Sequence, residues 1–515
     1  MSSIDCDKGR AAAEKFDLII VGGGIHGTML TLEASLRGIR TLLLEQDDFG
    51  AATSFNSLRI LHGGFRYLQH LDYQRLVVSA RERQWFLRFF PQLAMPLACL
   101  MPLYGRGLRR PLILGGAVKL YQLLTEKFNR ELSSDRKIPA GRILSCEETA
   151  ASAPWIIRKG LKGGAVWYDG FMPDSQRILI GALRWACDHG ATAINYCQAR
   201  SLITHAGRVV GVRAGDRKDG ASFEFRGDVV INAAGPWCRE VAVRFDRDHP
   251  RLFNTMVAWN VLFDRPSVSP YAMAVSPPRA GARTYFVVPW KGLLFAGTGQ
   301  VPWAAGRDTT PVREHELDAF CRDINMALPA LALKREDIVH VYSGQQSAKR
   351  AGGSDFTHRD VFVDHSQRGG PQKLYSISGI KFTTARRMAE RTLNKVFFPR
   401  RHVYTGKSTR FYDPPPDISQ TFMLFDYDWQ PPAGDDSWHQ MLQSLIAREA
   451  VQHLDDLVVR RSNLGDNPHR ALALAVRLSE LFDWDDARRK MEIKRLQDSY
   501  RQTGPEKDTR NPTFN

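Results

Sequence analysis

Strand-like and helix-like hydrophobic patterns alternate along the first part of the chain. Residues 16–21 form a continuous apolar run, as expected for a parallel strand that is buried on both faces. A helical pattern follows through about Arg37, with Gly38 near its C-terminal stop, and residues 40–46 predict a second strand. The pattern therefore predicts a strand, a tight turn, a helix and a strand in succession.

Two stretches far along the chain also begin with a strand pattern. Residues 227–237 form a short apolar strand that ends in Ala-Gly-Pro, and residues 373–397 predict a strand, a glycine turn and an amphipathic helix. Together with the first unit, they predict one α/β nucleotide-binding domain that is assembled from distant segments.

The turn after the first strand carries the pattern G-x-G-x-x-G at Gly22, Gly24 and Gly27, and Glu45 lies eighteen positions beyond the last glycine. The first glycine makes the turn, the second lets the backbone approach a pyrophosphate, and the third lets the helix pack closely. The helix N-terminus offers N–H groups to the phosphates, while the acidic residue can accept hydrogen bonds from a ribose. These features predict a dinucleotide site.

The composition changes after about Phe398, where proline-rich stretches favour extended backbone. Helical patterns at about 437–461 and 468–501 predict a small C-terminal helical domain over residues 410–502, and we expect a disordered tail from Thr503. Residues 81–125 mix aromatic, apolar and basic side chains. Such a mix is typical of a helix at an anionic lipid surface, and equally of helices that cover a core.

Charge and cysteine usage restrict the partners. The formal charge of +16 suits anionic substrates or an anionic membrane surface, and no zinc finger, aromatic RNA-binding signature or basic tail supports nucleic acid. The seven cysteines are scattered and form no C-x-x-C, so we expect core residues and no metal site. Without a long apolar run or a secretory signal, we expect the protein in the cytoplasm.

Motifs along nearly the whole chain resemble the FAD-dependent glycerol-3-phosphate dehydrogenases, within the amino-acid-oxidase-like flavoproteins. The motifs are the glycine turn at 22–27, "NSLRILHGGFRYL" at 56–68, "MPDSQRILI" at 172–180, "NAAGPW" at 232–237, "YFVVPW" with "FAGTG" at 285–299, "DIVHVYSG" at 337–344, "THRD" at 357–360, "SGIKFTT" at 378–384 and "DDLVVRRSNLG" at 455–465.

This resemblance implies FAD as the cofactor and a Rossmann-like FAD-binding domain interleaved with an α+β substrate domain over residues 16–400. The implied FAD-binding parts are about 16–80, 160–245 and 337–398. The implied substrate-domain parts are about 81–159 and 246–336.

The resemblance also implies site residues. Arg66 and Tyr67 would face the substrate phosphate, with Arg359 and Lys381 as further cations, because a dianionic phosphate needs cationic, multidentate donors. The residues implied to hold FAD are Gly22, Gly24, Ile25, His26, Gly27, Glu45, Gln46, Thr53, Ser54, Ser57, Arg59, Leu61, His62, Gly63, Gly64, Ala199, Ala234, Gly235, Trp237, Gly379, Lys381, Phe382 and Thr383.

Two positions depart from the family pattern. Asn260 stands where a histidine is expected to handle the hydroxyl proton, and Gln346 stands where a catalytic arginine is expected. An asparagine cannot act as a titrating base, and such a base is typically worth roughly 10²–10⁴-fold. We therefore expect hydride transfer from an alcohol carbon of a changed, phosphorylated or otherwise anionic substrate, with His62, His358 or Tyr67 as candidates for the missing base.

Two other functions stay open from the sequence. One is an amine or 2-hydroxy-acid oxidase of the same fold that uses O₂, and the other is a flavin-binding protein that has lost catalysis. The resemblance further implies a quinone or another electron acceptor and peripheral contact with the inner face of the cytoplasmic membrane. A homodimer is a further expectation.

Overall fold

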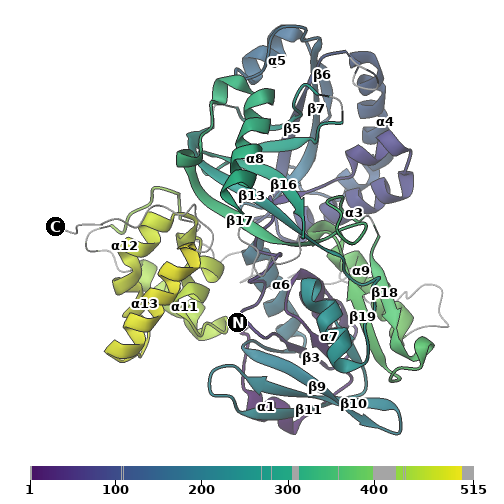
Figure 1. Ribbon diagram of the computed structural model, residues 1–515, viewed down its shortest axis with the longest axis vertical. Coiled ribbons are helices and arrows are strands. Elements are labelled where there is room, and N and C mark those ends of the chain that lie inside the picture. Colours follow the sequence, from purple (N-terminus) through teal and green to yellow (C-terminus); the bar gives the residue numbers. More distant parts are fainter. Residues whose placement is uncertain are drawn as a thin grey trace.

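The computed structural model describes residues 3–501 apart from 106, 108, 109, 268, 280, 304–311, 358, 398–424, 433, 435 and 436. Figure 1 shows three parts: a lower domain around a six-stranded sheet, an upper domain around a nine-stranded sheet, and a group of C-terminal helices beside the lower domain. The polypeptide passes several times between the lower and upper domains, so each is assembled from separate segments.

The lower domain is built on a sheet with the order β18-β19-β12-β2-β3-β8. Its neighbours pair in parallel except β18 with β19. The three segments predicted to converge lie side by side as β2, β12 and β19, which confirms that distant segments build one domain. The strands are β2 (Leu18–Val21), β3 (Thr41–Leu44), β8 (Thr192–Ile194), β12 (Val230–Asn232), β18 (Val361–Asp364) and β19 (Leu374–Ser378).

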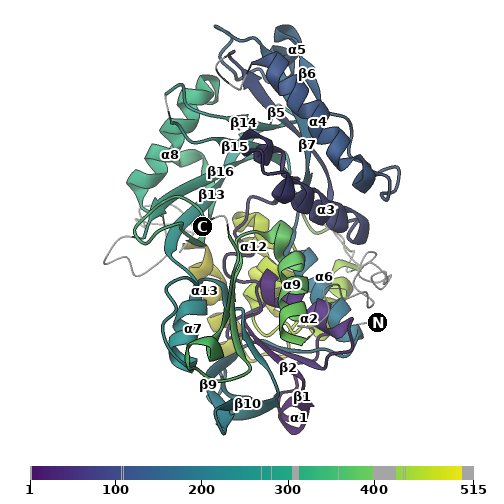
Figure 2. The same cartoon turned by 90° about the vertical axis from the view of Figure 1, so that its right-hand side faces the viewer.

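Both faces of this sheet are covered, which explains the continuous apolar run in β2. Leu18 and Ile20 pack on one face against α2 (Ile25–Ser35), α6 (Ser175–Asp188) and α9 (Ala385–Phe397) (Figure 2). Ile19 and Val21 point the other way and pack against a four-stranded sheet and α7 (Cys238–Phe245). That sheet has the order β1-β11-β10-β9, with β1 (Lys15–Phe16), β11 (Ser222–Gly227), β10 (Arg208–Asp216) and β9 (Cys197–His205); α1 (Lys8–Ala13) packs on β11.

The upper domain contains a largely antiparallel sheet with the order β17-β13-β16-β15-β14-β5-β7-β4, and β6 also pairs with β7. One face packs against α5 (Cys146–Ser152) and α8 (Glu314–Ala327), and the other against α3 (Tyr73–Phe89) and α4 (Pro111–Asn129). The strands are β4 (Ile60–Leu61), β5 (Met95–Leu103), β6 (Arg142–Leu144), β7 (Gly163–Phe171), β13 (Thr255–Pro266), β14 (Ala272–Val275), β15 (Tyr285–Trp290), β16 (Leu293–Pro302) and β17 (Ile338–Ser347).

Three strands lie in a different domain from the one the sequence indicated. β4, β7 and β17 fall within the expected FAD-binding parts 16–80, 160–245 and 337–398, yet all three pair in the upper sheet. The chain therefore enters the upper domain earlier and leaves it later than expected. The reason is that strand pairing decides membership, and an apolar strand pattern does not reveal its partner.

The aromatic segment of α3 belongs to the core. Trp85, Phe86 and Phe89 are at most 4% exposed, and Trp85 and Phe89 pack against Trp185 of α6, so this helix does not offer them to a membrane. In contrast, α4 carries exposed apolar side chains. In the part of the chain that the structure describes, no helix is long and apolar enough to cross a membrane.

The C-terminal domain is helical, as predicted, but its two predicted helices are broken. The first splits into α11 (Ser437–Arg448) and a π-helical turn (Asp456–Arg461), because Glu449 turns into the core and Ala450 has a positive φ of 54°. The second splits into α12 (Pro468–Ser479) and α13 (Asp486–Arg501). The predicted tail from Thr503 lies outside the described residues.

Buried ion pairs dock this domain on the lower one. Asp48, just after β3, accepts hydrogen bonds from Arg460 and Arg461 at 2.6 Å each. Arg460 also donates to Asp456, which accepts a further hydrogen bond from the hydroxyl of Tyr196 at 2.6 Å. Burial alone would raise the pKa of Asp48, but the two guanidinium groups hold it well below its usual range. The motif "DDLVVRRSNLG" therefore serves as the contact between domains.

All seven cysteines are free, and the predicted core role holds for most of them. Cys99, Cys197, Cys238 and Cys321 are buried, while Cys146 is exposed.

Candidate functional site

The glycine turn between β2 and α2 is shaped by close backbone contacts. Gly22 has a φ of 109°, and a Cβ there would lie 2.7 Å from the Cα of Ala234. A Cβ on Gly27 would lie 1.8 Å from the carbonyl oxygen of Gly22, so α2 can approach the turn only at a glycine. Gly24 caps α2, and a Cβ there would meet only the hydroxyl of Ser54, at 3.2 Å.

Glu45 lies at the end of β3 and faces this turn. Its Oε2 accepts the N–H of Gly23 at 2.6 Å, and its Oε1 accepts the N–H of Asp47 at 2.9 Å. Burial raises the pKa of Glu45 to about 7, although the two N–H groups oppose the rise. The carboxyl group is thus fixed where an acidic residue of a dinucleotide site is expected.

His26, in the first turn of α2, contacts the glycine turn after β19. A Cβ on Gly379 would lie 1.9 Å from Nε2 of His26. That nitrogen is buried and has no hydrogen-bond partner among the residues that the structure describes. Burial lowers the pKa of His26 to about 4, so the imidazole is neutral at physiological pH.

These features fit a bound dinucleotide such as FAD. The turn needs glycine at Gly22 and Gly27, the N-terminus of α2 lies beside it, and Glu45 lies at the end of the next strand. The orphaned nitrogen of His26 offers a polar contact between α2 and the turn at Gly379. Since β2, β12 and β19 are adjacent, the turns that follow them lie at the same edge of the sheet.

His62, the first residue of the "HGG" segment, pairs with Asp169 of β7. Nδ1 of His62 lies 3.2 Å from Oδ2 of Asp169, and the N–H of Gly63 donates to Oδ1 at 2.7 Å. Burial alone would raise the pKa of Asp169, but the hydrogen bond and charge of His62 and the charge of Arg83 hold it below its usual value. The side chain of His62 is 43% exposed, whereas that of Asp169 is buried.

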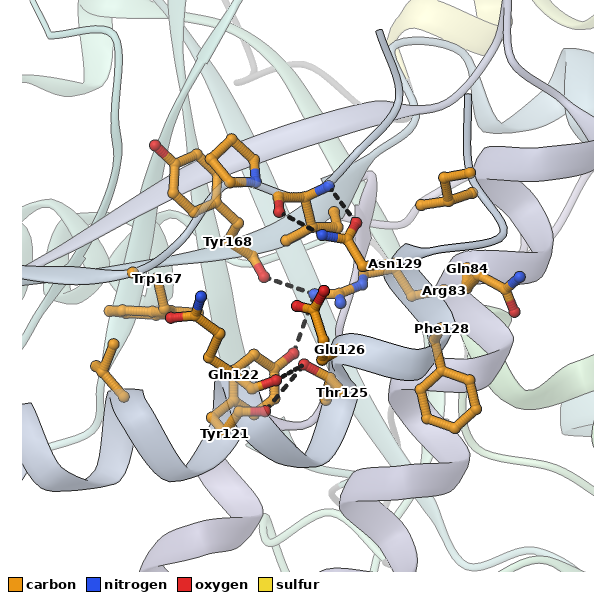
Figure 3. Close-up of a pocket in the computed structure, with 15 residues that line it drawn as sticks. Arg83, Gln84, Tyr121, Gln122, Thr125, Glu126, Phe128, Asn129, Trp167 and Tyr168 are labelled. Carbon is orange, nitrogen blue, oxygen red and sulfur yellow. Dashed lines mark hydrogen bonds between the residues drawn. The ribbon is translucent and has the colours of Figure 1, made fainter. Parts of the chain in front are cut away.

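Arg83 of α3 packs against Gly63, the residue after His62. Its Nη1 donates to the hydroxyl of Tyr121 at 3.0 Å and to the carbonyl oxygen of Tyr168 at 2.6 Å (Figure 3). A Cβ on Gly63 would lie 2.3 Å from the same nitrogen, so the guanidinium packs directly under the glycine. The cavity drawn in Figure 3 is small, about 30 Å³, and lies between α3, α4 and β7.

Lys381 is in contact with Tyr67. The ammonium group of Lys381 donates to the hydroxyl of Tyr67 and lies 4.6 Å from the centre of its ring. Arg75 lies over the same ring at 5.6 Å. Arg66 is exposed near the beginning of the 3-10 helix Phe65–His70, which also contains Tyr67. A cationic group and a phenol are thus assembled from segments 314 residues apart.

Arg359 lines an open cavity of about 400 Å³ at the start of β18. Three further cations line it: Arg251, Arg391 and Lys395. His358, which the sequence offered as a candidate base, lies outside the described residues.

Arg59, which the resemblance placed along the cofactor, is deeply buried among aromatic rings. It is 1% exposed and lies 5.3–5.5 Å from the ring centres of Phe55, Trp290 and Tyr342. Its Nη1 donates to the hydroxyl of Ser175 at 3.0 Å, which links the loop before β4 to α6. The sequence motif contains this arginine, but the enclosing rings come from three separate segments.

Asn260 holds two parts of the structure together. Its amide nitrogen donates to the carbonyl oxygen of Asn56 at 2.9 Å, and its amide oxygen accepts from the hydroxyl of Thr298 at 3.1 Å. The residue is 4% exposed. Both ends of the amide are therefore engaged. Gln346 is half-buried on β17 beside Met256.

The other predicted cofactor residues are spread over several elements. Ser54 accepts the N–H of Ile25, Thr53 donates to the carbonyl oxygen of Gln345, and Ser57 accepts the N–H of Arg59. Gln46 contacts Gln198, and the carbonyl oxygen of Ala199 accepts from Arg244. Leu61, Gly64 and Thr383 are buried, and Ala234, Gly235, Trp237 and Phe382 are half-buried.

Sequence reasoning missed several residues that shape this region. Asp169 orients His62, Arg83 underlies Gly63, and Asp48 receives the C-terminal arginine pair. For Asp169 a signal existed, since an acidic residue in the apolar run "GGAVWYDGF" needs a buried partner. For Arg83 and Asp48 the partners are remote in sequence, so no local pattern identifies them.

The sequence of this chain is similar to those of FAD-dependent oxidoreductases. The family described as FAD dependent oxidoreductase matches residues 17–392. The glycerol-3-phosphate dehydrogenase of Synechocystis is 30% identical over 420 residues, which cover 79% of this chain and 72% of the relative. The enzyme of the same name from Mycobacterium leprae is 32% identical over 384 residues, which cover 74% of this chain and 63% of the relative.

Solved structures share the fold. The glycerol-3-phosphate dehydrogenase from Bacillus halodurans, complexed with FAD, aligns with a TM-score of 0.69 and 20% identity over 96% of each chain. The L-α-glycerophosphate oxidase from Mycoplasma pneumoniae, with FAD bound, aligns with a TM-score of 0.54 and 14% identity. That alignment covers 78% of this chain and 99% of the oxidase.

Proposed function

The chain belongs to the family of FAD-dependent oxidoreductases, and we propose that it oxidises the alcohol carbon of a glycerol-3-phosphate-like or other phosphorylated, anionic substrate. The observation that carries the proposal is the pair formed by His62 and Asp169. An imidazole held at Nδ1 by a carboxylate leaves Nε2 free to accept a proton, which is what alcohol oxidation needs at neutral pH.

The residues that would hold FAD are those of the three turns at the sheet edge, with Gly22 to Gly27, Glu45 and Gly379 at the centre. When bound there, FAD supplies the acceptor for the hydride, at N5 of the flavin. The protein contributes orientation, charge and exclusion of water around that atom.

Nε2 of His62 would accept the proton from the oxygen of the substrate hydroxyl, and the hydride would leave the carbon that carries this hydroxyl. Asp169, kept ionised by its hydrogen bonds, would stabilise the imidazolium that forms and would hold the ring in one orientation. This assignment replaces the histidine that the family pattern led us to expect at Asn260, whose amide is used for structure.

Lys381, Tyr67 and Arg66 would bind the anionic end of the substrate. The contact between Lys381 and the Tyr67 hydroxyl supports this role, because a charge-assisted network of this kind presents several donors at once. The cations around the cavity at Arg359 add to the positive potential of the protein, which favours the approach of an anionic substrate.

The substrate class is tested by anaerobic reduction of the FAD-loaded protein. We expect a phosphorylated alcohol, with glycerol-3-phosphate as the first probe, to bleach the flavin absorption, and unphosphorylated glycerol to do so far less efficiently. Arg66→Ala should raise the apparent Kd for the phosphorylated alcohol at least about tenfold, since a charged hydrogen bond is worth about 1.5–3 kcal/mol. Arg213→Ala, an exposed arginine on β10, serves as the control.

Other outcomes of this test would contradict the proposal. Bleaching by amines or 2-hydroxy acids alone would favour an oxidase of the same fold. A flavin that no candidate substrate reduces would favour a non-catalytic protein. An Arg66→Ala variant with unchanged affinity would overturn the phosphate assignment.

We also propose peripheral membrane contact through α4, which lies on the outside of the upper domain (Figure 2). Leu112 and Leu123 are 90% and 76% exposed, and they flank the exposed Lys119 on this amphipathic helix. Apolar and basic side chains on one helix suit an anionic lipid surface. A quinone or another electron acceptor, a place at the inner face of the cytoplasmic membrane and a homodimer stay predictions.

Membrane contact is tested by co-sedimentation with phosphatidylglycerol vesicles. The wild-type protein should sediment with them in a salt-dependent manner, and the double variant Leu112→Ser with Leu123→Ser should lose most of this binding. Val476→Ser, an exposed apolar position on α12, should leave it unchanged. Equal binding by both variants would show that α4 is not the contact.

A further inference from the structure

Three metal-ligating side chains meet in the lower domain, apart from the cofactor turns. Asp246 follows α7, His249 lies three residues later, and His365 begins the turn after β18. Oδ2 of Asp246 lies 2.9 Å from Nδ1 of His365 and 3.7 Å from Nε2 of His249. The ligand atoms of all three residues lie within 4.8 Å of one another.

His249 is the member that hydrogen bonding does not explain. It is 2% exposed, and its Nε2 has no hydrogen-bond partner among the described residues. The 3.7 Å to the carboxylate of Asp246 is too long for a hydrogen bond. A buried polar atom without a partner destabilises the folded state. An ion shared with the carboxylate and the second imidazole would give this nitrogen a partner.

The surroundings of the cluster match those of a metal site. Nε2 of His365 lies 2.8 Å from the hydroxyl of Ser376, which leaves Nδ1 to face the cluster. The other carboxylate oxygen of Asp246, Oδ1, accepts from Arg247 at 3.2 Å, so Oδ2 alone faces the two imidazoles. Such outer partners fix the orientation of ligating histidines and carboxylates in metal sites.

We propose that Asp246, His249 and His365 bind a divalent transition-metal ion of the zinc class. Two imidazole nitrogens and one carboxylate oxygen are a donor set that Zn²⁺ accepts, with metal–ligand distances of about 2.0–2.2 Å. Donors on one tetrahedral ion of that size lie about 3.3 Å apart, and the observed 2.9 and 3.7 Å fall on either side of this value. A fourth position is left for water or another ligand.

The ion would clamp the loop after α7 to the hairpin of β18 and β19. These ligands are 119 residues apart in the chain, and a link that closes so long a loop stabilises the folded state. The clamp also reaches the cofactor region, because Ser376 accepts a hydrogen bond from Asn232, whose side-chain oxygen accepts the N–H of Ala234. The metal site is thus a structural element beside the FAD site.

The test uses untagged, FAD-loaded, full-length protein that has been dialysed against a chelator and then titrated with Zn²⁺ in a calorimeter. We expect one Zn²⁺ per chain by calorimetry and by metal analysis, with a higher Tm after loading. His249→Phe removes only the unpartnered imidazole, so the protein should keep its flavin spectrum while its affinity for Zn²⁺ falls at least roughly 100-fold. His205→Ala, an exposed histidine on β9, should bind like the wild type.

Co²⁺ gives a second readout of the same site. In the wild type it should produce visible ligand-field bands at one ion per chain, and in His249→Phe these bands should be lost. A wild-type protein that binds no stoichiometric Zn²⁺, or a His249→Phe variant that binds it equally well, would overturn the proposal. Neither result depends on catalytic activity, so the proposed oxidoreductase function is tested separately.

Discussion

At the residue scale, the chemistry depends on which histidine can accept a proton. The family pattern pointed to a position that holds Asn260 here, and both ends of that amide are bonded to the backbone of Asn56 and the hydroxyl of Thr298. His62, beside the predicted cofactor turns, is a partly exposed imidazole that the buried carboxylate of Asp169 orients. This contact supports the proposal that His62, and not a residue of β13, accepts the proton.

His62→Gln should therefore slow flavin reduction by bound substrate by roughly 10²–10⁴-fold, because the proton acceptor is lost. Asp169→Asn should also slow it, since an asparagine amide would donate to Nδ1 and place the imidazole proton on Nε2. The measurement is the single-turnover rate of anaerobic flavin bleaching as a function of pH. His315→Gln, an exposed histidine on α8, is the control. An unchanged rate in His62→Gln would remove this residue from the mechanism.

The raised pKa of Glu45 predicts that the free energy of unfolding depends on pH. Its pKa is about 7 in the folded protein against 4.5 for an ordinary glutamate, so the folded state holds the proton more tightly. Stability from this group is therefore present at low pH and is lost as the pH rises through about 7. The full difference corresponds to about 3 kcal/mol, and about 2 kcal/mol of it falls between about pH 5 and about pH 8, because part of the titration lies below pH 5.

The measurement is the free energy of unfolding of FAD-free protein at about pH 5 and about pH 8, compared with Glu45→Gln. The wild type should lose about 2 kcal/mol relative to the variant between these two pH values. A constant difference would mean that Glu45 is already ionised in the folded protein at the lower pH.

Some of these residues were predictable and others were not. The glycines, Glu45, Tyr67 and Lys381 could be singled out from motifs; the structure shows the glycines and Glu45 at the turn after β2 and Tyr67 in contact with Lys381, while their roles stay predictions. The partners Asp169 and Arg83 could not be paired with His62 and Gly63, because both contacts cross from one strand or helix to another.

At the scale of elements, α2 and α9 depend on two different kinds of contact. α2 approaches the turn after β2 so closely that Gly27 has no room for a side chain. α9 is held against α2 and α3 by Arg386, which donates to Glu82 at 2.9 Å and to Glu33 at 3.1 Å. Lys381 and Thr383 shortly precede α9. The ion pairs of Arg386 with Glu82 and Glu33 therefore also help to position the turn after β19.

Gly27→Ala should abolish FAD binding or weaken it severely. The new Cβ would lie 1.8 Å from a backbone oxygen, which cannot move aside as a side chain could. The measurement is the flavin content of the purified variant and its affinity for added FAD. Gly116→Ala, an open position on α4, should retain full flavin content. A Gly27→Ala protein with normal FAD affinity would show that the close approach is not required.

Arg386→Met should destabilise the protein by about 3–5 kcal/mol, because it removes the cation paired with the buried Glu82 and one of the two arginines paired with the buried Glu33. Arg387→Met, which breaks a partly exposed pair with Glu390, should cost less than about 1 kcal/mol. Chemical denaturation of the two FAD-loaded variants measures both values. Similar losses in the two proteins would contradict the role given to the buried cluster.

Most elements of the lower domain were predictable because their patterns are local. The apolar runs of β2 and β3, the glycine turn and the amphipathic α9 all appeared close to their observed bounds. The breaks in the C-terminal helices were not predictable, since Glu449 leaves the helix to reach Arg177 in another domain, at 2.7 Å.

At the scale of the whole molecule, the chain builds two interleaved domains and joins a third to them through buried charge. The interleaving was predicted from the returning segments, but β4, β7 and β17 proved to belong to the upper sheet. Sequence patterns identify strands, and they do not state which strand each one pairs with across a hundred residues. The docking of the C-terminal domain through Asp48, Arg460 and Arg461 could not be predicted from the sequence, because these partners are also far apart in the chain.

The most direct test of the molecule as a whole is titration of the purified, flavin-free protein with FAD, followed by quenching of flavin fluorescence. If the turns after β2, β12 and β19 cradle one cofactor, the titration will end at one FAD per chain and give a yellow protein with a structured flavin spectrum. A protein that stays colourless and leaves the fluorescence of added FAD unchanged would contradict the account.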